Sequence, residues 1–167
     1  MEFRAMRRKN QELSPADCDA VLRRGSHGVL AVCGDGGWPY AVPVNYVWAD
    51  GRLFFHCARA GHKLDAIAGE PRVSLCVVDA DELVPAEFTS YFRSVIVFGR
   101  ARVLTDPAQR RAALALVARR FGPGDPAEDE KELDRTLARV CLVEIEIAHM
   151  TGKQAIELVR REAGGAQ

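Results

Sequence analysis

Alternating apolar and polar positions, and short apolar runs between turns, predict that most of this chain forms β-strands. The runs are rich in β-branched and aromatic residues, which favour strands. The six predicted strands cover residues 28–33, 40–48, 52–57, 70–79, 91–105 and 141–150. Glycine-containing turns at 34–39 and 49–51 join the first three strands as hairpins.

Three features within these strands carry further information. Pro43 cannot donate to a strand ladder, so we expect an edge strand or a bulge there. Gly99 marks a bend in the longest strand. The last strand alternates strictly, and we expect its face with Leu142, Glu144 and Glu146 to contact water.

Helical patterns precede, separate and follow the strands. The first begins with Ser14 as N-cap and Pro15 at the first helical position, and it ends at Gly25. Further helices are expected at 62–69, 107–120, 128–138 and after residue 151, and an irregular crossing at 81–90. We therefore predict a mainly β (α+β) fold, a six-stranded antiparallel barrel with peripheral helices. The two longest helices would cover an opening or a partner surface.

Length and charge narrow the class of protein. We expect a single domain over residues 1–167, with loose termini at 1–12 and 161–167. The 23 basic and 23 acidic side chains give zero formal net charge. No overall field therefore attracts nucleic acid or an anionic membrane. Because no apolar run is long enough to span a membrane and no signal core is evident, we expect a cytoplasmic protein.

Several kinds of site find no support in the sequence. The five cysteines are scattered and include no C-x-x-C pair, which argues against a disulfide framework and a structural zinc site. The four histidines show no H-E-x-x-H spacing and no accompanying carboxylate cluster, so we predict no metal. A serine hydrolase is unsupported, because G-x-S-x-G is absent.

His62 and Lys63 open a predicted helix, where a cation faces the positive end of the helix dipole at a cost of roughly 0.3–1 kcal/mol. A solvated helix start would explain them. An anion would explain them equally well, most simply a phosphate held by the two cations and the free first-turn amides. Arg59 could add a third cation. From these residues alone, both interpretations stay open.

His56 and Cys57 end the strand that precedes this helix. A histidine there is either structural or, beside a phosphate, a ligand or proton donor. Cys57 would lie on the opposite face of the strand, where neighbouring cations could lower the pKa of its thiol. A catalytic thiol stays possible, although the sequence fixes no companion base.

Four stretches resemble one family: residues 28–48, 53–67, 90–104 and 149–159. They are similar to flavin-binding split-barrel proteins related to pyridoxamine 5′-phosphate oxidase, and within that group to the 5-nitroimidazole-resistance (Nim) proteins. The likeness extends from about residue 6 to residue 159 and is specific at Y-A-V-P, F-H-x-A-x-x-G-H-K, Y-F-R-S-V-I-V-F-G and H-M-T-G-K. It favours the phosphate interpretation of the helix start.

The resemblance implies an FMN-binding split barrel that forms a homodimer, with FMN in two equivalent clefts at the interface. Pro43, Val44 and Asn45 would contact the isoalloxazine ring of the flavin. His62 and Lys63 would bind its phosphate.

The resemblance assigns four further residues to the cofactor site. His56 and Cys57 would meet the flavin at the end of their strand, and Ser94, beside Arg93, would reach it from the longest strand. Which of these contacts come from the second subunit is left open. His56 stands where Nim proteins have a histidine near the flavin and the substrate, which makes it the candidate catalytic residue. Cys57 departs from the serine or threonine common at its position.

The activity so implied is that of a nitroreductase-like, FMN-dependent oxidoreductase. Reduced flavin would pass electrons to a nitroimidazole or another small electron acceptor. Three alternatives stay open: a flavin-binding redox carrier or sensor without a dedicated substrate, an oxidase like pyridoxamine-phosphate oxidase, and a structural barrel without a ligand. The residues that recognise pyridoxal phosphate in true oxidases have no evident match near the C-terminus, which argues against the second alternative.

Overall fold

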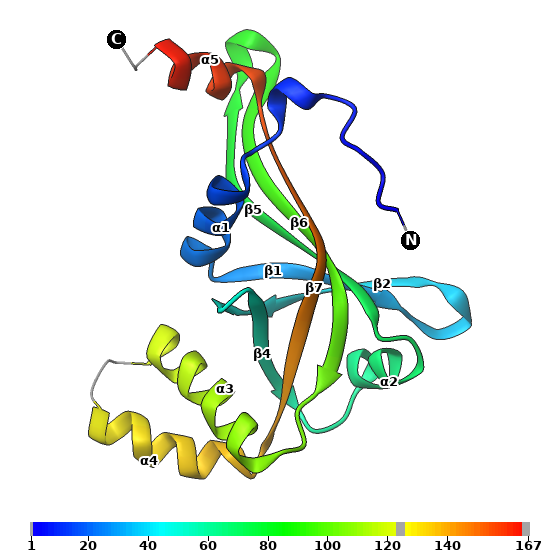
Figure 1. Ribbon diagram of the computed structural model, residues 1–167, viewed down its shortest axis with the longest axis vertical. Coiled ribbons are helices and arrows are strands. Elements are labelled where there is room, and N and C mark those ends of the chain that lie inside the picture. The colour runs from blue at the N-terminus through cyan, green and yellow to red at the C-terminus, as the bar shows by residue number, and fades with distance from the viewer. Residues whose placement is uncertain (1, 123–125, 165–167) are drawn as a thin grey trace.

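A computed structural model describes residues 2–122 and 126–164, and it is built around one antiparallel sheet (Figure 1). The strands are β1 (His27–Cys33), β2 (Pro39–Asn45), β3 (Val47–Ala49), β4 (Arg52–Ala58), β5 (Arg72–Val84), β6 (Thr89–Val103) and β7 (Val140–Gln154). The helices are α1 (Pro15–Arg24), α2 (His62–Gly69), α3 (Pro107–Phe121), α4 (Pro126–Leu137) and α5 (Ile156–Gly164). The strand order is β2-β1-β5-β6-β7-β4-β3.

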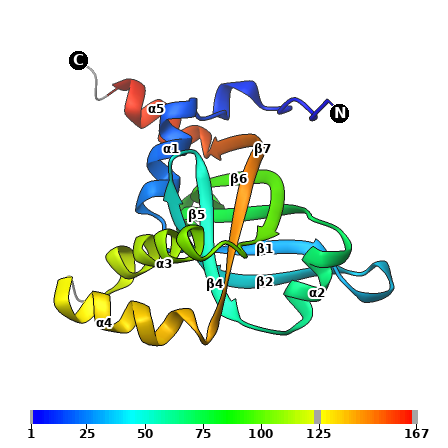
Figure 2. The same cartoon turned by 60° about the horizontal axis from the view of Figure 1, so that its bottom comes forward.

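The sheet curls into a split barrel (Figures 1 and 2). β2 and β3 follow each other in the chain yet form the two ends of the sheet, so the chain turns a corner between them. Tyr46 occupies this corner, where it is buried and donates its hydroxyl to the Leu22 carbonyl at 3.0 Å. The predicted strand 40–48 is therefore two strands with different partners. This is why the sheet has seven strands rather than six.

Several local predictions are confirmed. Ser14 caps α1 through a side-chain oxygen that accepts a backbone N–H at 3.1 Å, and α3 begins at residue 107. The cap of α3 is Asp106, whose side-chain oxygen accepts a backbone N–H at 2.8 Å. Pro43 lies in β2, an edge strand, where its missing donor interrupts no second ladder. The register between β6 and β7 shifts at Gly99, where a Cβ atom would collide with the backbone of Glu146.

Residues 81–90 do not form an irregular crossing. β5 continues to Val84 and β6 begins at Thr89, so the two strands form a long hairpin that projects from the barrel (Figure 1). Leu83 and Phe88 are 79% and 99% exposed. Apart from Tyr91, no hydrophobic side chain among residues 79–93 of this hairpin is buried, so this part lacks the alternation from which strands are predicted. We call residues 79–93 the hairpin arm.

The face of β7 that was expected to contact water is largely covered. Leu142 is fully buried, and Glu144 is only 5% exposed because Arg52 and Arg102 bind it at 3.2 and 3.0 Å. Glu146 remains exposed, as predicted. Both faces of this strand are therefore buried or half-buried over most of its length.

Two apolar clusters explain this arrangement. One fills the barrel and includes Leu30, Phe55 and Val97, with side chains of α1 and α2 packed at its margins. The other lies between α3, α4 and the β3–β4–β7 side of the sheet and includes Leu114 and Leu142. The two longest helices therefore cover one side of the barrel (Figure 2).

The segment before α1 contacts the sheet, and the last strand is longer than predicted. Before α1, Gln11 is buried and Glu12 forms an isolated backbone β-bridge with Lys153. The Phe3 ring stacks on His149, with ring centroids 4.5 Å apart. At the other end, β7 extends to Gln154, so the last helix begins at Ile156 and not at residue 151.

Candidate functional site

The N-terminus of α2 is uncapped and open. Gly61 precedes the helix with a φ of 136°, which L-residues rarely adopt, and it offers no side chain to cap the helix. A Cβ atom at Gly61 would meet nothing within 4 Å. The first amide with a backbone acceptor is that of Leu64, at 2.8 Å from the Gly61 carbonyl. The amides of His62 and Lys63 are thus donors available to an anion.

The His62 side chain packs against the hairpin formed by β1 and β2. Its ring stacks on Tyr40 of β2, with centroids 4.1 Å apart, and its Nε2 lies 3.8 Å from the carboxylate of Asp35. A Cβ atom at Gly34 would lie 3.2 Å from Nε2 and closer still to the backbone, so glycine makes room for this stack. The helix start is thereby fixed against β2.

Lys63 forms no hydrogen bond or ion pair with any described residue, although it acts electrostatically on Cys57. Burial raises the pKa of the Cys57 thiol, the Lys63 ammonium opposes this rise, and Cys141 adds to it. The expectation of a lowered pKa is therefore wrong, because desolvation outweighs the cation. Lys63 is half-buried and remains available to an anion beside the free amides.

His56 projects to solvent from the end of β4. It alternates with the buried Leu53 and Phe55, and it forms no hydrogen bond or ion pair within the described residues. Cys57 lies on the other face and packs against the barrel core. The two residues therefore occupy opposite faces of β4, as predicted, and only His56 is exposed.

β2 runs beside the start of α2 and the end of β4. Pro43 and Asn45 are exposed, whereas Val44 packs in the barrel core. Because β2 pairs only with β1, its other edge keeps backbone donors and acceptors that a planar ligand can use. β2 also contacts β4, so the start of α2, the edge of β2 and the end of β4 surround one region.

Ser94 and Arg93 lie elsewhere. Ser94 is opposite Lys153 near one end of β7, whereas Cys57 is opposite Cys141 near the other end. Residues 141 and 153 are 12 positions apart, about 40 Å along a strand. A single chain therefore brings together seven of the nine predicted site residues, and it places Ser94 and Arg93 at the opposite end of the sheet.

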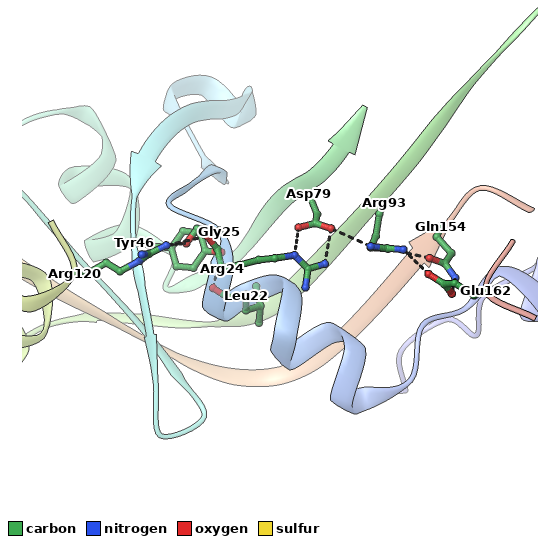
Figure 3. A network of polar contacts seen from close by, with 9 residues as sticks. All are labelled: Leu22, Arg24, Gly25, Tyr46, Asp79, Arg93, Arg120, Gln154 and Glu162. Carbon is green, nitrogen blue, oxygen red and sulfur yellow. Dashed lines mark hydrogen bonds and ion pairs between the residues drawn. The ribbon is translucent and has the colours of Figure 1, made fainter. Parts of the chain in front are cut away.

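Arg93 is engaged within its own chain (Figure 3). Its guanidinium donates to Gln154 at 2.9 Å and to Glu162 at 2.6 Å, and it lies 3.5 Å from Asp79. The same carboxylate of Asp79 holds Arg24 of α1 at 2.5 Å. This network ties the base of the hairpin arm to α1 and α5, and thereby orients the segment that carries Ser94.

A cavity of about 660 Å³ opens at the sheet, and its lining includes Cys33, Ser74, Phe98 and Phe3. It includes none of the nine predicted site residues. Among the side chains that the structure describes, no three histidine, cysteine or acidic groups lie together so that they could hold a metal ion. Among the described helices, none has the length and apolar character needed to cross a membrane.

Sequence reasoning missed Tyr40 and Asp35 as parts of this region. Tyr40 supplies the ring on which His62 stacks, and Asp35 approaches the same imidazole. Tyr40 begins the Y-A-V-P motif, so a signal was present, but aromatic residues of strands usually serve the core. Only the fold reveals that the turn 34–39 meets the start of α2.

Comparisons with known proteins agree with this architecture. A candidate 5-nitroimidazole antibiotic resistance protein from Bacteroides thetaiotaomicron superimposes with a TM-score of 0.71 at 18% identity, with 86% of each chain covered. A conserved hypothetical protein from Mycobacterium tuberculosis gives a TM-score of 0.78 at 20% identity, with 90% of each chain covered.

An FAD-binding protein from Mesorhizobium loti is 27% identical, with a TM-score of 0.62 over 87% of this chain and 97% of that one. No curated protein matches the sequence. The sequence model for pyridoxamine 5′-phosphate oxidase matches residues 14–154, which include every strand and the whole candidate site. The chain therefore belongs to the pyridoxamine 5′-phosphate oxidase family.

Proposed function

We propose that this chain is a cytoplasmic, homodimeric, FMN-dependent oxidoreductase that reduces a nitroimidazole or a similar small electrophile. The observation that carries the proposal is the start of α2, where the Lys63 ammonium forms no hydrogen bond or ion pair with any described residue and lies beside an uncapped, open helix N-terminus. The family membership and the FAD-binding relative from Mesorhizobium loti support a flavin as the ligand.

The residues present fit a flavin phosphate. The amides of His62 and Lys63 are free to donate, the helix dipole favours an anion, and Gly61 leaves the approach open. His62 is kept in place by its stack on Tyr40. The cost of placing two cations at a helix start would then be offset by the bound phosphate.

The isoalloxazine ring would lie along the exposed edge of β2, at Pro43, Val44 and Asn45, and would extend toward His56 and Cys57. Bound flavin supplies hydride or electron transfer, and the protein orients and tunes it. The exposed His56 imidazole would hold or deliver a proton to the reduced substrate. Cys57, with its raised pKa, would meet the flavin as a neutral thiol and not as a nucleophile.

A second copy of the chain would complete the site. Ser94 and Lys63 lie at opposite ends of the sheet, so both can serve one flavin only if different protomers supply them. The outer face of the sheet, which we define as Val29, Ala31, Cys76, Ile96 and Phe98, is suited to this contact. Val29, Ile96 and Phe98 are 42%, 39% and 38% exposed, and cross-strand register makes the five residues neighbours.

The test is the visible absorption spectrum of the freshly purified protein, followed by denaturation and mass identification of the released chromophore. FMN is the expected chromophore, whereas released FAD would keep the flavin and correct its identity. A colourless protein that takes up neither added FMN nor added FAD would overturn the proposal. Steady-state reduction of a nitroimidazole, against a single bleaching of the flavin, then separates an enzyme from a redox carrier.

A further inference from the structure

Two of the five cysteines face each other across neighbouring strands. Cys57 of β4 is in direct antiparallel register with Cys141 of β7. Residues opposite each other in such a pair have Cα atoms about 4.5–5.5 Å apart, inside the range of about 4.4–6.8 Å found across disulfides. The sheet therefore brings together two thiols that are 84 residues apart in the sequence (141 minus 57).

Both side chains lie on the same face of the sheet. Their neighbours along the two strands, Phe55 and Val143, are a register pair, and both belong to the barrel core. Cys57 and Cys141 are partly exposed, so they continue this row to the rim of the barrel. Cys141 also acts on the pKa of Cys57, which places the two sulfur atoms within electrostatic reach.

The other three cysteines have no such partner. Cys76 lies opposite Val29 and Ile96, on the outer face. Cys33 is exposed at the end of β1, opposite Pro39. Cys18 is buried in α1. Cys57 and Cys141 are thus the only pair in cross-strand register among the five cysteines, all of which the structure describes.

We propose that Cys57 and Cys141 form a reversible redox pair that closes as a cross-strand disulfide. A low-molecular-weight disulfide is the oxidant. One protein thiolate attacks it, forms a mixed disulfide and expels one small thiolate, and the second protein thiolate then displaces the other. The two protein thiols lose two electrons and two protons in all, and the small disulfide is reduced to two thiols.

The environment of Cys57 fixes how this exchange depends on pH. Lys63 and Cys141 are the groups that act on it, and burial keeps its thiol pKa above the ordinary value. Since only the thiolate attacks, this raised pKa slows attack by Cys57 near neutral pH, and a rise in pH speeds it.

Oxidised glutathione is the probe, and the native full-length protein is the sample. After incubation and blocking of remaining thiols, a tryptic digest without reductant is expected to contain peptides 53–59 and 140–153 joined by a disulfide. Each cysteine lies in a different tryptic peptide, so the linkage is unambiguous. The intact chain should lose about 2 Da, the mass of two hydrogen atoms, at the joined pair, and dithiothreitol should restore it.

Two single variants, Cys57→Ser and Cys141→Ser, supply the matched controls. In each, the remaining cysteine should stop at the glutathione mixed disulfide, with no joined peptides. Cys76→Ser should leave the wild-type linkage unchanged. A wild-type digest with only glutathione adducts, or with Cys57 or Cys141 linked elsewhere, would overturn the proposal. The assay reads sulfur chemistry, and the absorbance of bound flavin is recorded on the same sample, so the redox pair and flavin binding are judged by separate measurements.

Discussion

The Lys63 ammonium stands beside two free helix amides and has no hydrogen bond or ion pair among the described residues, so its removal is a direct test of the phosphate site. A charge-assisted contact to phosphate contributes about 1.5–3 kcal/mol. We expect Lys63→Ala to weaken FMN binding by roughly 10- to 100-fold, as measured by quenching of flavin fluorescence. Binding of riboflavin, which has no phosphate, should change little.

Lys131 offers a matched control for this measurement. It is exposed on α4, which packs with α3 on one side of the barrel, away from the start of α2. Lys131→Ala removes the same charge and should leave the FMN affinity within about twofold of the wild type. If Lys63→Ala weakened riboflavin and FMN equally, Lys63 would act on something other than the phosphate.

His56 can be tested by a different experiment, because its imidazole is exposed and forms no hydrogen bond or ion pair within the part of the chain that the structure describes. We expect His56→Ala to retain bound flavin and to lose turnover by about 10²–10⁴-fold, the usual contribution of a positioned proton donor. Flavin content by absorbance and nitroimidazole reduction by steady-state kinetics measure the two effects separately. Purification of the variant without flavin would refute this division of roles.

Residue-level reasoning found the two cations because their placement conflicts with the helix dipole, and such conflicts are visible in a sequence. It misjudged the charge state of Cys57, since neighbouring cations can be read from the sequence but the depth of burial cannot. It also missed Tyr40, whose stacking on His62 depends on a turn that folds back onto α2.

Among the structural elements, the corner between β2 and β3 depends on Tyr46. Burial raises the pKa of Tyr46 to about 12, above the value of about 10 in an unfolded chain. The unfolded chain therefore loses this proton first. Stability that is fully present below pH 10 falls as the pH rises from about 10 to about 12.

A Tyr46→Phe variant isolates this effect, because it keeps the ring and has no titrating hydroxyl. At pH 8 we expect it to be about 1 kcal/mol less stable than the wild type, the contribution of the lost bond to the Leu22 carbonyl. Urea unfolding at increasing pH should show this difference shrinking and then reversing above about pH 11. A difference that stays constant up to pH 11.5 would contradict the raised pKa.

The base of the hairpin arm provides a second test at this scale. The Asp79 side chain is 10% exposed and binds Arg24 of α1 and Arg93 of β6 (Figure 3). Asp79→Asn leaves both guanidinium groups short of an acceptor and should lower the free energy of unfolding by about 1–3 kcal/mol. Asp134→Asn breaks an exposed pair with Arg111 and should cost less than about 0.5 kcal/mol. Equal costs in urea titrations would count against this network.

Elements with a buried stripe and a capping residue, such as α1 and α3, could be predicted from the sequence almost to the residue. The hairpin arm could not, since Leu83 and Phe88 are exposed and no period of two marks its strands. The prediction for Glu144 is wrong for the opposite reason, because here the alternation is clear but the charged side chain is buried. A charged residue in an alternating strand usually faces water, whereas here it is buried between two arginines of other strands.

At the scale of the whole molecule, the path of β7 separates the two halves of the predicted site. The resemblance proposes residues that would bind flavin, but the sequence does not indicate that Ser94 and Lys63 lie at opposite ends of one sheet. That separation follows only from the order and register of the strands. It is also the reason why we propose that a second copy of the chain covers the outer face.

Ile96 lies near the centre of this outer face, beside Cys76 and one row from Phe98. If a second copy covers the face, Ile96→Glu places charged groups in an apolar contact on both protomers at once. We expect this variant to remain folded, because Ile96 is 39% exposed in the single chain, and to elute as a monomer at micromolar concentration. Light scattering coupled to size exclusion measures this directly.

The same variant should lose flavin affinity, because a monomer cannot receive Ser94 from a partner. Phe121→Glu is the matched control, since Phe121 is 42% exposed at the end of α3, away from the outer face. It should stay dimeric and retain flavin. A monomeric Ile96→Glu protein with unchanged FMN affinity would show that one chain suffices to bind the cofactor, and Ser94 would then have to be removed from the site.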